Sequence, residues 1–185
     1  MITKEIKTAF NEFCKEDTIV HADQITAGLI NATYLVENDK KEKYILQKIN
    51  TFVFKNPDEL MENIVCVTKY ITDKIKQAGG DYKRENLNFL ACENGKYYFR
   101  DENGNAWRMY IYVDNAVTYN KPKNTDTFRN AGCSFGRFMK LLDGYPAETL
   151  YETIKNFHYT PARYEKFLAS VEADIKGRKA ECEKE

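Results

Sequence analysis

The sequence carries no excess of charge of either sign and no long apolar segment. Lysine and arginine total 28, aspartate and glutamate also total 28, and the formal net charge is zero. A nucleic-acid-binding protein usually carries a basic excess, so this balance argues against such a partner. No apolar run approaches the ~18 residues of a membrane-spanning helix, and the N-terminal segment lacks the apolar core of a signal peptide. We therefore expect a cytoplasmic protein with no nucleic-acid or membrane partner.

Histidine is scarce, and neither the histidines nor the cysteines have the spacing of a metal or catalytic site. The five cysteines are odd in number, and no two of them form a Cys-x-x-Cys pair. This spacing predicts neither a zinc site nor a disulfide framework, so we expect free thiols in a reducing compartment. The two histidines, His21 and His158, have no partner motif for a nucleophile–base pair.

The motifs of a complete phosphate-transferring enzyme are also missing. The sequence contains no Walker A segment, no Gly-x-Gly-x-x-Gly loop and no Asp-Phe-Gly or Asp-x-Asp metal motif. His21-Ala22-Asp23 fits His-x-Asp, but no asparagine lies five residues after the aspartate, and the segment precedes the predicted sheet. We therefore predict no catalytic residue and no metal-ligating residue.

A hairpin followed by a long helix is the clearest pattern that is present. Residues 25–36 and 44–50 read as strands on either side of a wholly polar turn. Asn56, Pro57 and Glu59 then provide an N-cap, a first-turn proline and a capping-box acid for a helix. One face of that helix is apolar, and Gly79-Gly80 ends it; the face consists of Leu60, Ile64, Val67, Ile71 and Ile75.

Two Asn-Gly turns among aromatic-rich segments predict the rest of the sheet. Strands are expected at residues 87–91, 96–99 and 107–113. The remainder is helical in pattern, around residues 131–142 and again from Thr160-Pro161, and a short amphipathic helix opens the chain. The predicted fold class is α+β, with about five antiparallel strands and one long helix, followed by further helices.

The turn at residues 27–33 is the first candidate for binding phosphate. Gly28 lets the backbone approach a phosphate, and successive N–H groups of a turn form an anion cradle. Asn31 and Thr33 add short polar side chains. The alternative is an ordinary strand that contains one glycine, because a single glycine is a weak motif.

Three further polar residues could complete such a site. Gln47 and Lys48 are neighbours on the following strand and compete for the phosphate-facing role, in which charge favours Lys48. Glu62, early in the long helix, would brace that cation. The alternative is that Lys48 and Glu62 are ordinary solvated surface residues. An ion pair between them, facing an open cleft, would favour the first interpretation.

Several blocks of the sequence resemble a known family. Residues 28–34, 44–50, 53–64 and 135–158 are similar to the aminoglycoside-phosphotransferase-like kinases, in particular the N-acetylhexosamine 1-kinase branch. The segments Ile-Leu-Gln-Lys-Ile-Asn and Asn-Phe-His are the more specific parts of this resemblance, which covers most of the chain. It implies a protein-kinase-like fold, with a small lobe over residues 1–115 and a hinge and partial helical lobe over residues 116–185.

The resemblance also implies a ligand and a reaction. ATP would bind between the glycine turn and a hinge that includes Ile111 and Val113, and Mg²⁺ would accompany it in the complete family member. The family transfers phosphate from ATP to a hydroxyl of a small molecule, here N-acetylhexosamine or another sugar. Since no position matches the family's catalytic aspartate or metal-binding acids, we expect a truncated, nucleotide-binding N-terminal fragment that is inactive alone.

Other interpretations stay open. The chain could be a non-catalytic interaction module, half of a split kinase that needs a complementing lobe, or an unrelated α+β domain of similar layout. A truncated lobe should expose apolar helix faces and self-associate. The candidate residues for that exposed face are Tyr151, Ile154, Phe157, Tyr164 and Phe167.

Overall fold

A computed structural model describes residues 2–119 and 121–182 of the 185-residue chain. These residues form two compact units, Met1–Thr153 and Ile154–Glu185. The first unit extends beyond the boundary predicted after residue 115, because the later segment bonds back to the long helix. The Tyr70 hydroxyl donates to the Asp143 carbonyl at 2.7 Å, and Asn63 and Tyr151 exchange hydrogen bonds of 2.8 and 2.9 Å. None of the helices in the described ranges has the length and apolar composition needed to cross a membrane.

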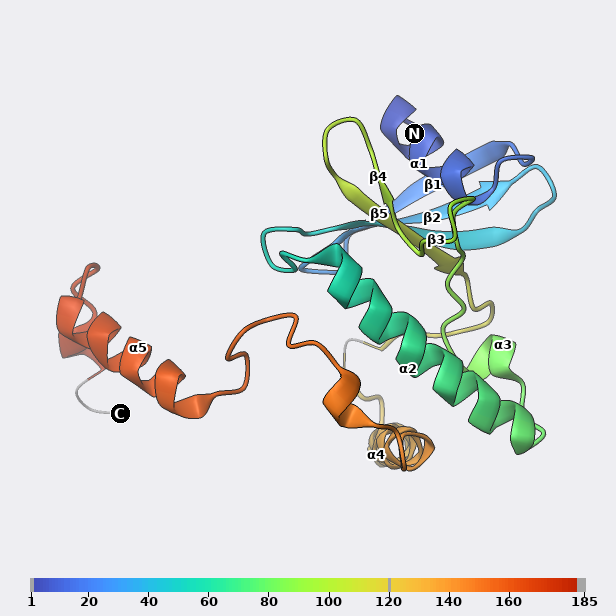
Figure 1. Cartoon of the computed structure of the whole chain (residues 1–185). Coiled ribbons are helices and arrows are strands. Elements are labelled where there is room, and N and C mark those ends of the chain that lie inside the picture. Colours follow the sequence, from blue (N-terminus) through green and yellow to red (C-terminus); the bar gives the residue numbers. More distant parts are fainter. Residues whose placement is uncertain (1, 120, 183–185) are drawn as a thin grey trace. The chain divides into compact units, whose positions relative to one another are not determined.

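The first unit is built on a five-stranded antiparallel sheet (Figure 1). The strand order is β1-β2-β3-β5-β4, so β3 lies at the centre and β5 pairs with it. This confirms an α+β fold with five antiparallel strands. The strands are β1 (Ile19–Ile25), β2 (Ala32–Asn38), β3 (Lys43–Ile49), β4 (Phe99–Arg100) and β5 (Ala106–Ile111).

Several details of the sheet differ from the sequence-based prediction. The strand predicted at residues 25–36 begins only at Ala32, and the one predicted at residues 96–99 is reduced to Phe99–Arg100. Residues 19–25 form β1, which was not predicted, since its edge position leaves most of its side chains exposed. The strand predicted at residues 87–91 is reduced to a single bridge between Phe89 and Tyr110. There the Asn88 side chain donates to the backbone carbonyls of Tyr82, Lys83 and Asn86, and such local bonds compete with a regular ladder.

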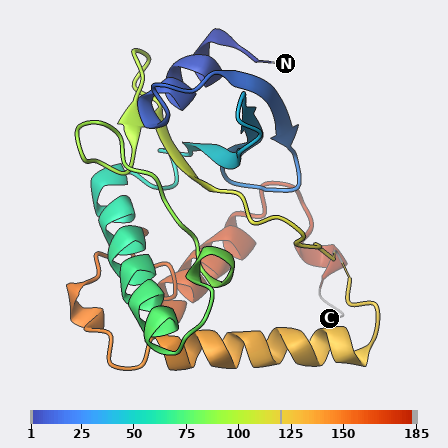
Figure 2. The same cartoon turned by 90° about the vertical axis from the view of Figure 1, so that its right-hand side faces the viewer.

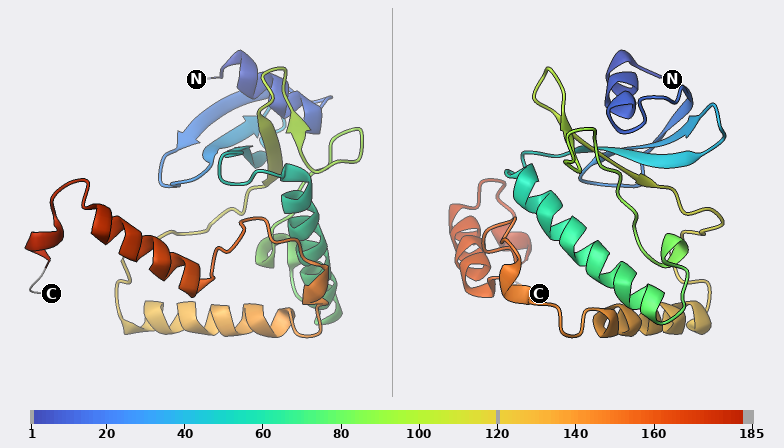
Figure 3. Two further views of the ribbon diagram at one scale, coloured as in Figure 1. Left: turned by 60° about the vertical axis from the view of Figure 1, so that its left-hand side comes forward. Right: turned by 45° about the vertical axis from the view of Figure 1, so that its right-hand side comes forward.

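Helices cover the two faces of the sheet, as Figures 1 and 3 show. Helix α1 (Lys4–Phe13) packs on one face, where Phe10 and Trp107 are fully buried. Helix α2 (Pro57–Gln77) packs on the other, where its Leu60 and Met61 share a second core with β3 and β5. The Asn56 cap of α2 is confirmed, because its side chain accepts from the N–H groups of Asp58 and Glu59.

Helix α4 (Thr125–Leu141) ends the helical part of the first unit and lies across the C-terminal end of α2 (Figure 2). An ion pair between Arg137 of α4 and Glu85 of the short α3 (Tyr82–Glu85) holds it there. A 3₁₀ turn, η1 (Ala147–Thr149), follows.

The second unit contains α5 (Thr160–Ala173) and the 3₁₀ turn η2 (Lys179–Glu181). Pro161 lies in the first turn of α5, as predicted, but the N-cap is Tyr159, whose side chain makes no capping bond. Residue Asp174 ends the helix in the left-handed conformation, with φ of 36°.

Candidate functional site

Three polar side chains form a row across the middle of the sheet, on the face that α2 covers. Thr33, Gln47 and Arg108 are direct cross-strand partners on β2, β3 and β5. The Gln47 amide nitrogen donates to the Thr33 hydroxyl at 3.0 Å, and Arg108 Nε donates to the Gln47 carbonyl oxygen, also at 3.0 Å. The row therefore holds one guanidinium in a fixed orientation by way of two uncharged side chains.

Arg108 is half-buried and has no acidic partner. Its Nη1 lies 3.8 Å from the Met61 sulfur, and its guanidinium lies over the Phe89 ring at 5.6 Å. Within residues 2–119 and 121–182, no carboxylate lies within ion-pair distance of it. Burial lowers the pKa of Arg108, and the nearby Tyr110 partly opposes this effect. A cation is thus held on this face without neutralisation.

An exposed loop leads directly into this row. It joins β1 to β2 and contains Gly28, and the side chain of Leu29 at its tip is 100% exposed. Asn31 anchors the loop, because its side-chain oxygen accepts from the Asn50 N–H at 3.0 Å, while the Asn50 amide donates to the Ile30 carbonyl. Asn31 therefore positions the loop backbone, whereas Thr33 belongs to the polar row itself.

Gly28 is not demanded by space or by backbone conformation. A Cβ atom at this position would meet only the Asn31 carbonyl oxygen, at 3.9 Å. Because Gly28 has no side chain, the loop backbone is open to approach from solvent.

Lys48 lies on the opposite face of the sheet, because successive strand residues point to opposite sides. Its ammonium forms an ion pair with Glu5 of α1 at 2.9 Å and lies 5.5 Å from the centre of the Trp107 ring. The predicted ion pair with Glu62 is therefore wrong. Glu62 is exposed on α2, where its charge raises the pKa of Tyr151, whose hydroxyl also hydrogen-bonds to it.

A second, largely apolar row runs beside the first. Leu35, Ile45 and Tyr110 are cross-strand partners on the same face, each two positions away from the member of the polar row on its own strand. Tyr110 also packs against Phe89, with ring centres 5.1 Å apart. Polar and apolar rows thus lie next to each other on one face.

The two residues assigned to the hinge lie apart from both rows. Ile111 is partnered with Tyr44, so it belongs to the α1 face. Val113 lines a cavity of about 530 Å³ in the first unit, between α2, the segment after α3, and α4. Other residues lining this cavity are mostly apolar and include Ile64, Val67, Ile71, Leu87 and Phe138.

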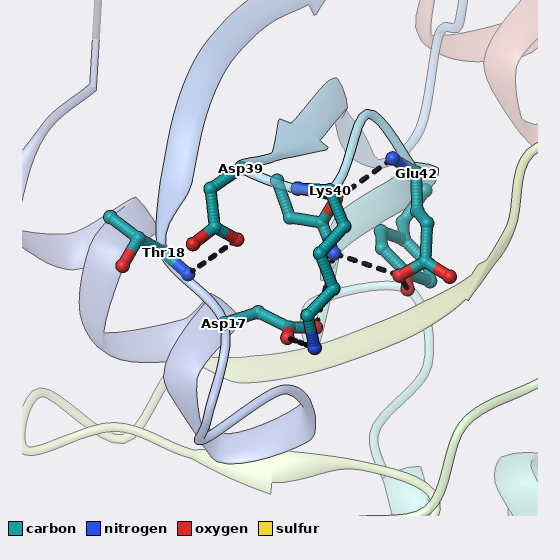
Figure 4. A network of polar contacts seen from close by, with 7 residues as sticks. Asp17, Thr18, Asp39, Lys40 and Glu42 are labelled. Atoms are coloured by element: carbon teal, nitrogen blue, oxygen red, sulfur yellow. Dashed lines mark hydrogen bonds and ion pairs between the residues drawn. The ribbon is translucent and has the colours of Figure 1, made fainter.

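The hairpin that joins β2 to β3 is fixed by a network around Asn38 (Figure 4). The Asn38 side chain is fully buried, donates to Asp17 and Glu42, and accepts from the N–H groups of Lys40 and Glu42. Lys40 forms an ion pair with Asp17, and the Asp39 carboxylate accepts from the Thr18 N–H. These contacts connect the hairpin to the segment before β1.

Residues 132–136 have the Gly-x-Ser-x-Gly spacing of a nucleophile elbow, but they lie inside α4. A nucleophile elbow requires a sharp turn between a strand and a helix. Here the Ser134 hydroxyl instead donates to the Asn130 carbonyl one turn earlier. The described residues also contain no cluster of three or more His, Cys, Asp or Glu side chains arranged to hold a metal.

The structure brings together two of the residues selected from sequence, Thr33 and Gln47, and adds Arg108 to them. Strand alternation alone separates Gln47 from Lys48, but Arg108 could be found only from the β3–β5 register, which the sequence does not state. No protein-family model matches the chain.

Proposed function

We propose that the first unit is the nucleotide-binding lobe of an ATP-dependent small-molecule kinase of the aminoglycoside-phosphotransferase-like type. The acceptor in this proposal is N-acetylhexosamine or another sugar, which follows from the sequence resemblance alone. The observation that carries the proposal is the glycine-containing loop that leads into a polar row with an uncompensated cation.

The two adjacent rows match the two halves of a nucleotide. The apolar row of Leu35, Ile45 and Tyr110 would contact the base, and the loop around Gly28 would supply backbone N–H groups to the phosphates. Thr33 and Gln47 would orient the polar end of the ligand. In this arrangement Lys48 and Glu5 hold α1 against the sheet and do not touch the nucleotide.

These residues would bind and orient a nucleotide without transferring its phosphate. Phosphoryl transfer depends on positioning and on neutralising charge, to which Mg²⁺ and its acidic ligands contribute centrally. Since the described residues offer no such ligand cluster, the proposal assigns them no metal-assisted step.

Isothermal titration calorimetry with ATP, with and without Mg²⁺, tests the proposal. We expect weak binding that Mg²⁺ changes little, because residues 2–119 and 121–182 offer no acidic cluster to hold the ion. Gln47→Ala should weaken binding by roughly tenfold, the effect of losing one polar contact near a charged ligand. Lys48→Ala, the matched control on the neighbouring position, should leave the affinity unchanged. A folded protein that does not bind millimolar ATP, or equal losses in the two variants, would contradict the proposal.

A further inference from the structure

Arg108 differs from three lysines that approach the sheet of the first unit. Lys48 is paired with Glu5, Lys96 with Asp58 and Lys15 with Glu93. Arg108 is more enclosed than these lysines, yet its Nε donates to an amide and its Nη1 faces a thioether sulfur. Within the described part of the chain it has no carboxylate partner, so its charge is compensated by nothing on the sheet.

A structural role explains this arrangement poorly. Enclosing a charge costs free energy unless the charge is paired, and an aliphatic side chain of similar size would pack against Met61 and Phe89 without that cost. Every buried polar side-chain atom of the described residues has a hydrogen-bond partner. Nη2, the one Arg108 nitrogen that bonds to no described residue, is therefore not fully enclosed.

We infer that the Arg108 guanidinium is the anchor for the phosphate groups of the nucleotide. This inference rests on the proposed function and goes further, because it assigns the cation to β5, whereas the sequence had assigned it to Lys48 of β3. Gln47 and Thr33 act as positioning residues, since they hold Nε and leave the Nη1–Nη2 edge with no partner among the described residues stronger than the Met61 sulfur. That edge can donate two parallel hydrogen bonds to phosphate oxygens, the geometry in which arginine binds phosphate best.

An anion at this site would have to displace the contact between Nη1 and the Met61 sulfur. The contact of Nη1 with the Met61 sulfur is long and weak, because a thioether is a poor acceptor. A phosphate oxygen would replace it with a charge-assisted bond. The loop around Gly28 begins next to Thr33 and could close over the same phosphate, which would place backbone N–H groups opposite the guanidinium.

Binding of three probes to the whole chain tests the inference: ATP, inorganic tripolyphosphate and adenosine. We expect Arg108→Met to weaken ATP and tripolyphosphate by about 30-fold, which is about 2 kcal/mol at ~1.4 kcal/mol per tenfold, and to leave adenosine unchanged. The affinities of Arg108→Lys for ATP and tripolyphosphate should lie between those of the unsubstituted protein and those of Arg108→Met, because lysine keeps the charge but lacks the forked guanidinium. Arg100→Met is the matched control, since Arg100 is an exposed arginine on β4 that is partnered with Ala106 on the same face. It should change none of the three affinities.

The outcomes separate this inference from the proposed function. If the protein binds ATP and Arg108→Met keeps its affinity within twofold, the inference is wrong and the nucleotide site stands. If tripolyphosphate binding depends on Arg108 but ATP binds no more tightly than tripolyphosphate, the anion site stands and the nucleotide function is wrong. If the unsubstituted protein binds none of the three probes, both the inference and the proposed function are wrong. Urea unfolding of each variant checks the fold, and Arg108→Lys provides the measurement if Arg108→Met is unfolded.

Discussion

The buried Asn38 side chain gives the sharpest test of how the first unit is held together. In Asn38→Ala four hydrogen bonds are lost, two to the carboxylates of Asp17 and Glu42 and two from backbone N–H groups. At a net value of roughly 1 kcal/mol per bond, the loss is about 4 kcal/mol before the partners adjust. Lys40 and Glu42 are exposed and can regain water, so we expect about 3 kcal/mol.

Urea unfolding followed by tryptophan fluorescence measures this loss directly. The chain has one tryptophan, Trp107, which is fully buried in the core that α1 covers and therefore reports on the same unit. The urea midpoint should fall while the slope stays the same, because the surface exposed on unfolding hardly changes. Asp39→Ala is the control, since the exposed Asp39 carboxylate makes a single bond of 3.2 Å to the Thr18 N–H.

The two variants must differ for the reasoning to hold. Asp39→Ala should cost about 0.5 kcal/mol, as most exposed substitutions do. If Asn38→Ala costs no more than Asp39→Ala, the network in Figure 4 does not stabilise the hairpin, and its polar groups are as well solvated in the unfolded chain.

Two further predictions concern acid stability and self-association. Hydrogen bonds lower the pKa of Asp17, chiefly from Lys40, and that of Asp58, chiefly from Tyr98. The folded-state pKa values of both carboxyl groups lie below the ordinary value of 3.8. The stabilisation that the two ionised carboxylates contribute is therefore complete above pH 3.8 and is lost as the pH falls through the lowered pKa values. Urea midpoints measured from neutral pH downward should therefore drop below about pH 4, and less so in Asp58→Asn; equal pH profiles would contradict this. Phe135 and Phe138 of α4 are 73% and 46% exposed, so light scattering at high concentration should detect dimers or larger species that Phe135→Ser reduces. A monodisperse monomer would count against it.

Local signals in the sequence predicted α2 well, whereas α4 begins at Thr125, before the helix expected around residues 131–142. The cap at Asn56, the proline at 57 and the apolar face placed α2 to within a residue, since all three act within a few positions. The Asn-Gly turns were also correct, because Gly95 and Gly104 both adopt φ of 78°, which side-chain-bearing residues avoid.

The sheet was less predictable, because its pairing depends on residues far apart in the chain. β1 carries few buried side chains, so no alternating pattern marked it. The prediction of the candidate site was incomplete for the same reason. Arg108 stands next to Gln47 only through the β3–β5 register, although the two residues are 61 positions apart. Charge alone had favoured Lys48, but a residue's face is decided by whether its position is odd or even along the strand.

The alternation along β3 gives its register against β5 a consequence for the chemistry of both faces. Gln47 and Lys48 are adjacent, and the pairing of β3 with β5 decides which of them faces Arg108. A slip of one residue in that pairing would turn the ammonium toward the guanidinium and the amide toward Trp107. Two cations would then repel each other on the α2 side, and Glu5 would lose its partner on the α1 side. The register of β3 against β5 thus determines which charged groups lie on each face of the sheet.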